Sequence, residues 1–242
     1  MKDLPTTPAK KVFVLGGSGA LGQALLWELA EAKADVVAFT YHQQHDAALA
    51  LGRTLGFTAH CVDLRQPQAL PDLFRNLALK ERWPDVVVHC AGVAPALALA
   101  EIDAEGWDTV HAVHGRAALQ CAQLLSEREQ PGALVLVAAL DGLLPVPAPA
   151  HYAASQAAMW GLTMALAKEL GPKGILVNLA MVGVLDAGIS TELAPALRAS
   201  YQRYAALGRA GTCAEAARGL RWLALENTYL NGARFPLTGG LG

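Results

Sequence analysis

A short apolar run that is closed by glycines and followed at once by a helical pattern limits the fold of this chain more than any other feature. The run "KVFVL" (11–15) is typical of a buried strand, and "ALGQALLWELAEAK" (20–33) repeats apolar residues at the spacing of a helix. The glycines at this junction are Gly16, Gly17, Gly19 and Gly22. Glycines there let the backbone turn tightly and approach a pyrophosphate, whose charge is favourable at a helix N terminus. The junction predicts a dinucleotide site, and the alternative that it leaves open is a glycine-rich turn that binds nothing.

Strand and helix patterns alternate along the rest of the chain. Further apolar runs typical of buried strands are "DVVAFTY", "FTAHCVD", "PDVVVHCAG", "GALVLVAAL" and "GILVNLA". Because helical patterns separate them, we predict an α/β fold with a doubly wound, Rossmann-type parallel sheet and helices on both faces. We expect a polar tail over residues 1–10 and a single domain over residues 11–242. The irregular segment 181–211 follows a predicted strand end, and we expect it to cover a substrate.

Composition argues against several classes of function. The 242-residue chain is 53% hydrophobic and has a formal charge of −2 without a basic cluster, which argues against nucleic acid as a partner. No apolar run reaches the ~18–20 residues of a membrane span. The four cysteines show no CxxC spacing and the seven histidines no HExxH spacing, so we expect no metal site. The first residues lack the apolar segment of a signal peptide, so the cytoplasm is the expected location.

Two later strand ends are predicted to lie beside the glycine junction. Asp63 in "CVDL" ends the third predicted strand, and "HCAG" (89–92) ends the fourth. In a doubly wound sheet these ends face the crevice where ligands bind. The predicted dinucleotide-binding residues are Gly16, Ser18, Gly19, Leu21, Gly22, Asp63, Leu64, Ala91 and Gly92.

Six segments in a fixed order carry a resemblance to a known family. They are the glycine junction, "VDL", "CAG", "YAASQAAMWGLTMALAKELGPKGILVN", "GRAGTCAEAARGLRWLA" and "YLNGARFPLTGG". With these segments the chain resembles a short-chain dehydrogenase/reductase over nearly its whole length. It is similar to the 3-oxoacyl-thioester reductases, which act on CoA or acyl carrier protein thioesters. The resemblance implies a seven-stranded parallel sheet and an NAD or NADP cofactor.

The catalytic positions of this family are only partly kept. The family's tyrosine is present as Tyr152 in the stretch "HYAASQ". The resemblance places the family's lysine at Gln156, its serine at Ala139 and its helix asparagine at His114. The asparagine that follows the family's fourth strand is Cys90 here. The active site therefore resembles a degenerate one.

These replacements predict a large loss of activity. In the active family the tyrosine exchanges a proton with the substrate oxygen while hydride moves to or from the nicotinamide. A free phenol has a pKa near ~10, and the lysine's cation at ~4 Å favours the phenolate by roughly 4 kcal/mol. Gln156 carries no charge, although its amide can reach a ribose hydroxyl, and Ala139 deletes a donor whose loss typically lowers a rate ~10²–10³-fold. We therefore expect Tyr152 to be a remnant and the chain to be catalytically silent by itself.

Two other functions stay open at this point. The first is an active NAD(P)H-dependent 3-oxoacyl-thioester reductase of unusual mechanism, in which His114 or water assists Tyr152. The second is a regulatory module that senses a dinucleotide without turning it over. Turnover by the purified chain separates the first from the silent subunit, and an effect of dinucleotide on another protein identifies the second.

The cofactor and the partner are predicted from two further features. The second predicted strand ends "FTYHQQ", without the acidic residue that binds a ribose 2′-hydroxyl in NAD-type sites, and His42 offers a weak contact for a 2′-phosphate. We expect NADP(H) over NAD(H), with complete loss of cofactor binding as the alternative. The predicted helices 101–125 and 151–170 are apolar beyond one stripe and must bury a second face. The resemblance implies that they contact another subunit, either an active short-chain dehydrogenase paralogue that acts on an acyl thioester or a second copy of this chain.

Overall fold

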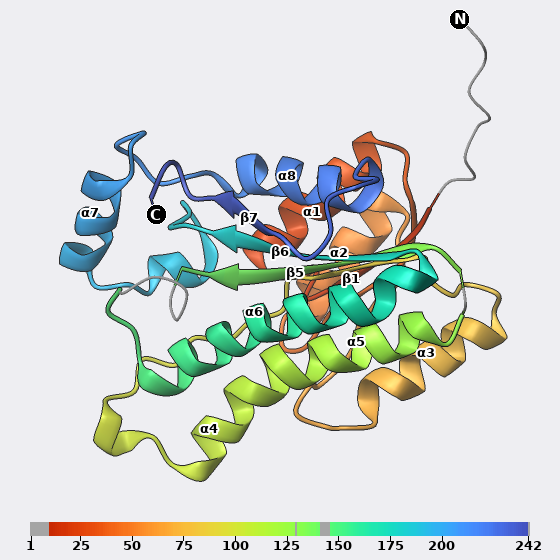
Figure 1. Cartoon of the computed structure of the whole chain (residues 1–242), viewed down its shortest axis with the longest axis horizontal. Helices are drawn as coiled ribbons and strands as arrows, with labels where there is room; N and C mark the ends of the chain where they lie inside the picture. The colour runs from red at the N-terminus through yellow and green to blue at the C-terminus, as the bar shows by residue number, and fades with distance from the viewer. Residues whose placement is uncertain (1–9, 129, 141–145, 242) are drawn as a thin grey trace, which may run out of the picture.

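Seven parallel strands form one sheet at the centre of the molecule (Figure 1). The computed structural model describes residues 10–128, 130–140 and 146–241. The strands are β1 (Lys11–Leu15), β2 (Asp35–Tyr41), β3 (Ala59–Cys61), β4 (Val86–His89), β5 (Gly132–Ala139), β6 (Ile175–Val182) and β7 (Arg234–Leu237). Their order is β3-β2-β1-β4-β5-β6-β7, and every neighbouring pair is parallel. The predicted doubly wound α/β fold is confirmed.

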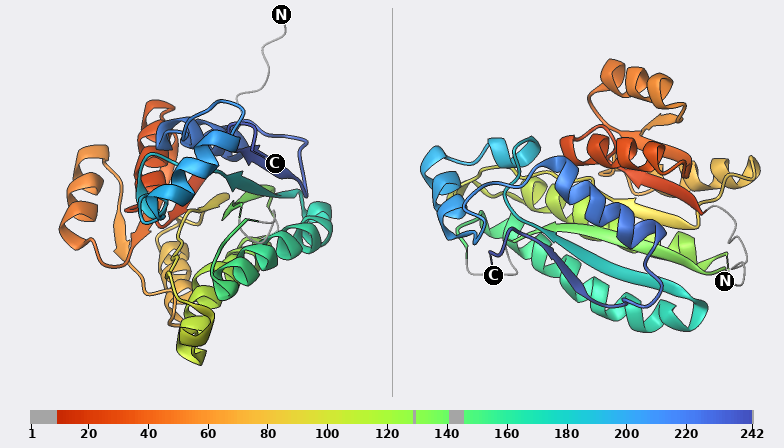
Figure 2. Two further views of the ribbon diagram at one scale, coloured as in Figure 1. Left: turned by 90° about the vertical axis from the view of Figure 1, so that its left-hand side faces the viewer. Right: turned by 90° about the horizontal axis from the view of Figure 1, so that it is seen from above.

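Helices cover both faces of the sheet (Figure 2). One face packs against α1 (Ala20–Glu31), α2 (His45–Leu55) and α8 (Cys213–Leu225), and the other against α3 (Ala69–Leu79), α5 (Ala117–Ser126) and α6 (Ala150–Leu170). The side chains of β1 alternate between these faces, as the two-residue period of a strand requires. Val12 and Val14 contact the α1 side, whereas Phe13 and Leu15 contact the α5 side. The continuous apolar run 11–15 is therefore explained by burial on both faces.

The helix predicted over residues 101–125 is interrupted, and this corrects the sequence-based expectation. A 3₁₀ turn, η1 (Leu99–Glu101), precedes α4 (Ala104–His111), and a π-helical turn, η2 (Ala112–Arg116), separates α4 from α5. The wider turn leaves carbonyl groups for a side chain from the sheet. His89 Nε2, at the end of β4, lies 3.1 Å from Val113 O and 3.3 Å from His114 O. Such π-turns are rare and are frequent at functional sites.

The segment after β6 is partly helical. It contains the 3₁₀ turn η4 (Gly188–Thr191) and α7 (Pro195–Tyr204), and another 3₁₀ turn, η3 (Gly171–Lys173), lies before β6. The role of residues 181–211 as a substrate cover stays a prediction, and residues 1–9 of the predicted tail lie outside the described residues. Within the described part of the chain, no helix combines the length and apolarity that crossing a bilayer requires.

Candidate functional site

A pocket of about 570 Å³ opens where the strand order reverses, between the carboxyl ends of β1 and β4. In open α/β sheets this switch point is where ligands bind. Every residue predicted for the site lines this pocket. They are Gly16, Ser18, Gly19, Leu21, Gly22, Asp63, Leu64, Ala91, Gly92, His114, Ala139, Tyr152 and Gln156. The fold thus brings the predicted residues together, while their individual roles stay predictions.

The glycine junction forms a tight wall at one end of the pocket. Gly16 has φ +80°, and a Cβ there would lie 2.5 Å from the backbone of Ala91 on the β4 loop. Among the described side chains none caps the N terminus of α1, which begins after Gly19. Because the first amides of a helix lack intrahelical acceptors, this end of the pocket presents open N–H donors and the positive end of the helix dipole.

Asp63 and Arg65, which follow β3, form an ion pair that also lines the pocket. Arg65 donates to both carboxylate oxygens of Asp63 at 2.8 to 3.2 Å. The Arg65 guanidinium lowers the pKa of the Asp63 carboxyl to about 2. His42 Nε2 lies 3.8 Å from the same carboxylate, and both His42 and Arg65 line the pocket. Arg65 was not predicted, although its position two residues after Asp63 is the available signal.

At the opposite end of the pocket, the His114 side chain is hydrogen-bonded to two other segments of the chain. Its Nε2 accepts a hydrogen bond from the Val93 N–H at 3.2 Å, and its Nδ1 lies 2.8 Å from Ser155 Oγ. The Ser155 hydroxyl donates to Tyr152 O at 2.7 Å. Burial lowers the pKa of His114 to about 3. The ring is therefore neutral with its proton on Nδ1, because the Val93 amide can only donate.

His114 and Tyr152 are also direct neighbours. Their rings pack edge to face, with centroids 5.7 Å apart and an interplanar angle of 79°. Both ring nitrogens of His114 already have partners in Val93 and Ser155. This arrangement favours a role for His114 in holding the pocket wall over a role in moving protons.

Gln156 is turned toward the protein. Its Oε1 accepts the Ala139 N–H at 2.9 Å, its Nε2 lies 3.2 Å from His114 Nδ1, and the residue is 3% exposed. Gln156 lines the pocket as well, and the expectation that its amide reaches a ribose hydroxyl stays a prediction. The bond to Ala139 forms because a backbone N–H of β5 beside a buried side chain needs an acceptor, and Gln156 supplies it.

Besides Arg65, sequence reasoning gave no role to Ser155, which is buried behind His114, or to Ser190, which lines the pocket. Ser155 lies three residues after Tyr152, so the helical period gave a signal for it. Ser190, on η4, accepts the Leu185 N–H at 3.0 Å, and only the chain path after β6 brings them together. Within the part of the chain that the structure describes, no cluster of three or more His, Cys, Asp or Glu residues is arranged to hold a metal ion.

The buried side chains of His89 and His114 lead us to expect that the stability of the fold decreases at acidic pH. Burial lowers the pKa of His89 to about 4 and that of His114 to about 3. Above pH ~6.5 both states of the protein are neutral at these groups; below it the unfolded chain binds protons first, so stability falls as pH falls. At roughly 1.4 kcal/mol per pH unit and per group, we expect the free energy of unfolding to drop by about 4 kcal/mol from pH 7 to pH 5.

Urea unfolding at both pH values measures this drop. In His114→Gln, which keeps an acceptor for the Val93 amide, the drop should be about half as large because one of two titrating groups is gone. Equal stability of the natural chain at pH 7 and pH 5 would contradict the prediction.

Fold and pocket together define a Rossmann-type α/β protein with its cavity at the switch point of the sheet. A family model described as "Enoyl-(Acyl carrier protein) reductase" matches residues 18–242. The chain belongs to the short-chain dehydrogenase/reductase family of oxidoreductases, as the resemblance predicts.

Relatives match the chain along its whole length. The cyclic-di-GMP-binding biofilm dispersal mediator protein of Escherichia coli is 30% identical over 237 residues, covering 96% of this chain and 97% of that protein. The 3-oxoacyl-[acyl-carrier-protein] reductase FabG of Chlamydia trachomatis is 26% identical over 242 residues, with 96% and 97% covered. Among solved structures, a Burkholderia cenocepacia short-chain dehydrogenase in complex with NADP has a TM-score of 0.88 at 26% identity, covering 96% of this chain and 97% of that one. BdcA in complex with NADPH has a TM-score of 0.86 at 29% identity, with 96% and 94% covered.

Proposed function

We propose that this chain is a catalytically silent short-chain dehydrogenase that binds NADP(H) and acts as the structural partner of an active paralogue. The observation that carries the proposal is the contrast between the two ends of one pocket. The glycine end has open helix amides, whereas Gln156 and His114 at the other end are buried and bonded to the protein's own backbone.

The residues present support binding better than chemistry. The amides at the start of α1 would hold the pyrophosphate, and Ala91 and Gly92 lie beside it. A bound nicotinamide would supply hydride transfer. Tyr152 would have to hold and release the proton with the neutral amide of Gln156 where the family has a lysine, and with Ala139 where it has a serine. Loss of the lysine cation, worth roughly 4 kcal/mol, lowers the expected rate ~10³-fold. Loss of the serine donor lowers it ~10²–10³-fold, although such losses rarely add.

The preference for NADP(H) rests on the end of β2. Residues 42–44, which follow β2 and line the pocket, include no carboxylate, and His42 lies beside the paired Asp63 and Arg65. A 2′-phosphate therefore meets a histidine and an arginine instead of an unpaired acid. The two solved relatives with NADP and NADPH support the same class of ligand.

Binding and turnover by the purified chain test this function. We expect saturable NADPH binding in a fluorescence titration, weaker binding of NADH, and no NADPH oxidation above background with a 3-oxoacyl-CoA thioester. Robust turnover that Tyr152→Phe abolishes would establish the alternative, an active reductase of unusual mechanism. Absence of binding by either reduced dinucleotide would overturn the cofactor part of the proposal. A dinucleotide that changes the affinity for a protein other than a dehydrogenase would instead support the sensing module.

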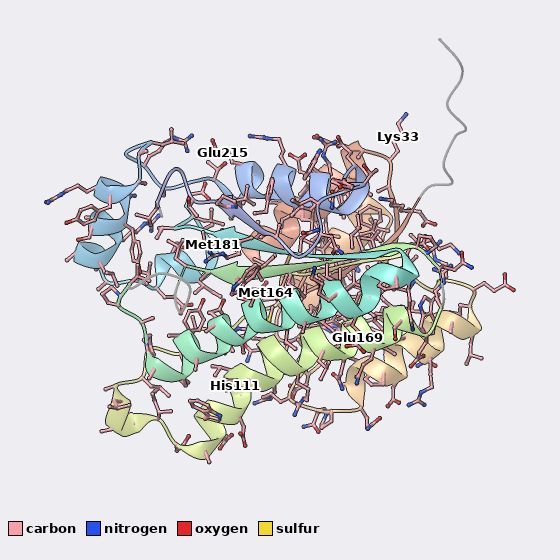
Figure 3. The ribbon with its side chains drawn as sticks, viewed as in Figure 1. Lys33, His111, Met164, Glu169, Met181 and Glu215 are labelled. Atoms are coloured by element: carbon pink, nitrogen blue, oxygen red, sulfur yellow. The ribbon has the colours of Figure 1, made fainter. Side chains whose placement is uncertain are left out.

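The partner is proposed from the outer faces of the helices beside the pocket. Trp107 on α4, Leu119 on α5 and Met164 on α6 are exposed apolar side chains, and Gly161 on α6 has open space beside it. Figure 3 shows His111 on α4 and Met164 on α6 at this side of the molecule. A second short-chain dehydrogenase could bury these side chains and support its own tyrosine helix against α6, which is how a silent subunit would assist an active one.

Assembly gives a prediction with a matched control. We expect the chain, co-expressed with an active paralogue, to elute as a hetero-oligomer in size exclusion with light scattering. Met164→Glu should abolish this assembly, because a charge buried without a partner is strongly unfavourable. Trp27→Glu on α1 should leave it intact, since Trp27 is similarly exposed (49% against 45% for Met164) but lies on the opposite face. Elution as a homo-oligomer would mean that the partner is a second copy of this chain. A chain that stays monomeric would contradict both kinds of assembly.

A further inference from the structure

The two ends of the pocket differ in how their backbone donors are used. At the end that contains Tyr152, three pocket-lining amides already donate to pocket-lining side chains. The pairs are Val93 N–H to His114 Nε2 at 3.2 Å, Ala139 N–H to Gln156 Oε1 at 2.9 Å and Leu185 N–H to Ser190 Oγ at 3.0 Å. These pairs come from three separate parts of the chain, so the internal use of backbone donors at this end is not confined to one strand.

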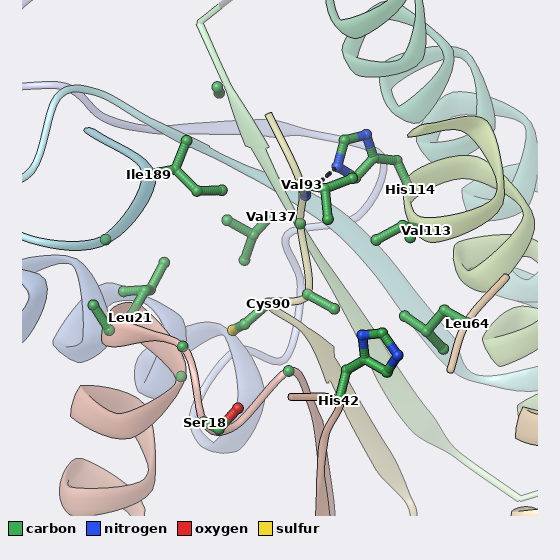
Figure 4. A pocket seen from close by; sticks show the side chains of 18 of the residues that line it. Ser18, Leu21, His42, Leu64, Cys90, Val93, Val113, His114, Val137 and Ile189 are labelled. Atoms are coloured by element: carbon green, nitrogen blue, oxygen red, sulfur yellow. Dashed lines mark hydrogen bonds between the residues drawn. The ribbon is translucent and has the colours of Figure 1, made fainter. Parts of the chain in front are cut away.

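The glycine end is different. No side chain among the described residues caps α1, so the amides of its first turn have no side-chain acceptor. Ser18 and Leu21 line the pocket beside them, and Figure 4 shows Ser18 and His42 at this end. A diphosphate placed here gains charge-assisted hydrogen bonds without displacing any side chain.

The walls of the Tyr152 end also approach each other. A Cβ on Gly92 would lie 3.6 Å from Ile189 Cδ1 and 3.5 Å from His114 Nε2, so the gap between Gly92 on the β4 loop and Ile189 on η4 has room for about one methyl group. Figure 4 shows Ile189 and Val93 on either side of this end, with His114 bonded to Val93. A ring that entered between Gly92 and Ile189 would have to separate them.

A nicotinamide carboxamide would also compete for amides that are already satisfied. Each amide taken by the ligand removes the backbone donor of one acceptor atom on His114, Gln156 or Ser190, and this loss offsets part of the gain. The offset is largest at His114 and Gln156, which are buried. The diphosphate of the same ligand meets no side-chain acceptor at the first amides of α1 among the described residues. Binding energy is therefore concentrated at the glycine end.

We propose that this pocket recognises the adenosine diphosphate part of its ligand and gains no affinity from the nicotinamide ring. Its ligand class is then nucleotides that contain ADP-ribose or its 2′-phosphate, whether or not they carry nicotinamide. The inference rests on the proposed function, because it concerns the same pocket. It separates this chain from a redox enzyme, in which the ring must be held.

Calorimetric titration with NADPH, NADP⁺ and 2′-phospho-ADP-ribose tests the inference, since the third compound is NADP⁺ without nicotinamide. We expect the three dissociation constants to agree within about 3-fold, far from the tenfold that a single good interaction confers. Binding of NADP⁺ or NADPH more than tenfold tighter than 2′-phospho-ADP-ribose would overturn the inference and leave the proposed function standing. Absence of binding by all three to a folded chain would overturn this inference together with the cofactor part of the proposed function.

A pair of variants tests the satisfied amide directly. Ser190→Ala frees the Leu185 N–H, so NADP⁺ should gain about 5- to 10-fold over 2′-phospho-ADP-ribose, the effect of one hydrogen bond. The neighbour Thr191, whose hydroxyl donates to Gly188 O, provides the control, and Thr191→Ala should keep the natural ratio. An unchanged ratio in Ser190→Ala, or an equal gain in Thr191→Ala, would overturn the assignment.

Discussion

The triple variant Gln156→Lys, Ala139→Ser, His114→Asn should acquire NADPH-dependent reduction of a 3-oxoacyl thioester at least ~10³-fold above the natural chain. The lysine restores a cation worth roughly 4 kcal/mol beside Tyr152, and the serine restores a donor worth ~10²–10³ in rate. The three changes belong together, because Gln156 is bonded to the Ala139 amide and lies against His114. Steady-state NADPH oxidation measures the gain.

Two further variants control this repair. Adding Tyr152→Phe to the triple variant should remove the new activity, because the repaired groups act through the tyrosine. Ala139→Ser alone should produce little NADPH-dependent turnover, because the effects of groups in one catalytic unit are strongly non-additive. A triple variant that binds NADPH and still shows no turnover would show that silence has another origin than these positions.

Gly22→Ala should destabilise the fold by about 1–3 kcal/mol, the range expected for an overpacked site, and weaken NADPH binding more than tenfold. A Cβ at Gly22 would overlap the carbonyl oxygen of Gly16 and lie 2.8 Å from Gly17 Cα. Both contacts are with backbone, so α1 must move away from the junction, and its amides move with it. Urea unfolding and an NADPH titration measure the two effects.

Gly19→Ala is the matched control. A Cβ there would lie 3.5 Å from Gly16 O, an ordinary contact, and φ is −69°. We expect a loss below about 1 kcal/mol, which is the preference for glycine over alanine at a helix N-cap. Equal destabilisation by the two variants would mean that close packing at Gly22 does not position α1.

The sequence sufficed for the architecture and for the location of the site. Apolar runs such as 11–15 and the helical spacing that follows are local patterns, and a parallel sheet is the arrangement that buries them. The strand ends then meet at one edge, which is why Asp63 and Gly92 could be placed beside the glycine junction before any coordinates. The resemblance to the family also sufficed to show that Gln156 and Ala139 stand where the family has its lysine and serine.

Tertiary structure decided what the replaced residues do. The carbonyl groups of Val113 and His114 in the π-turn after α4 contact His89, which lies at the end of β4, more than twenty residues away along the chain. No periodic pattern encodes such a contact, because the pattern records only which face of an element is buried. Hydrogen-bond partners across elements depend on how those elements pack.

The same reason explains the two ends of the pocket. The sequence shows a histidine at position 114 and a serine at position 190, but not that their nitrogen and oxygen accept the amides of Val93 and Leu185. Those amides became available only when the β4 loop and the segment after β6 were brought to the edge of the sheet. A buried backbone donor must find an acceptor. The acceptors that the fold placed nearby were these side chains, and this proximity decided which end of the pocket stayed open to a ligand.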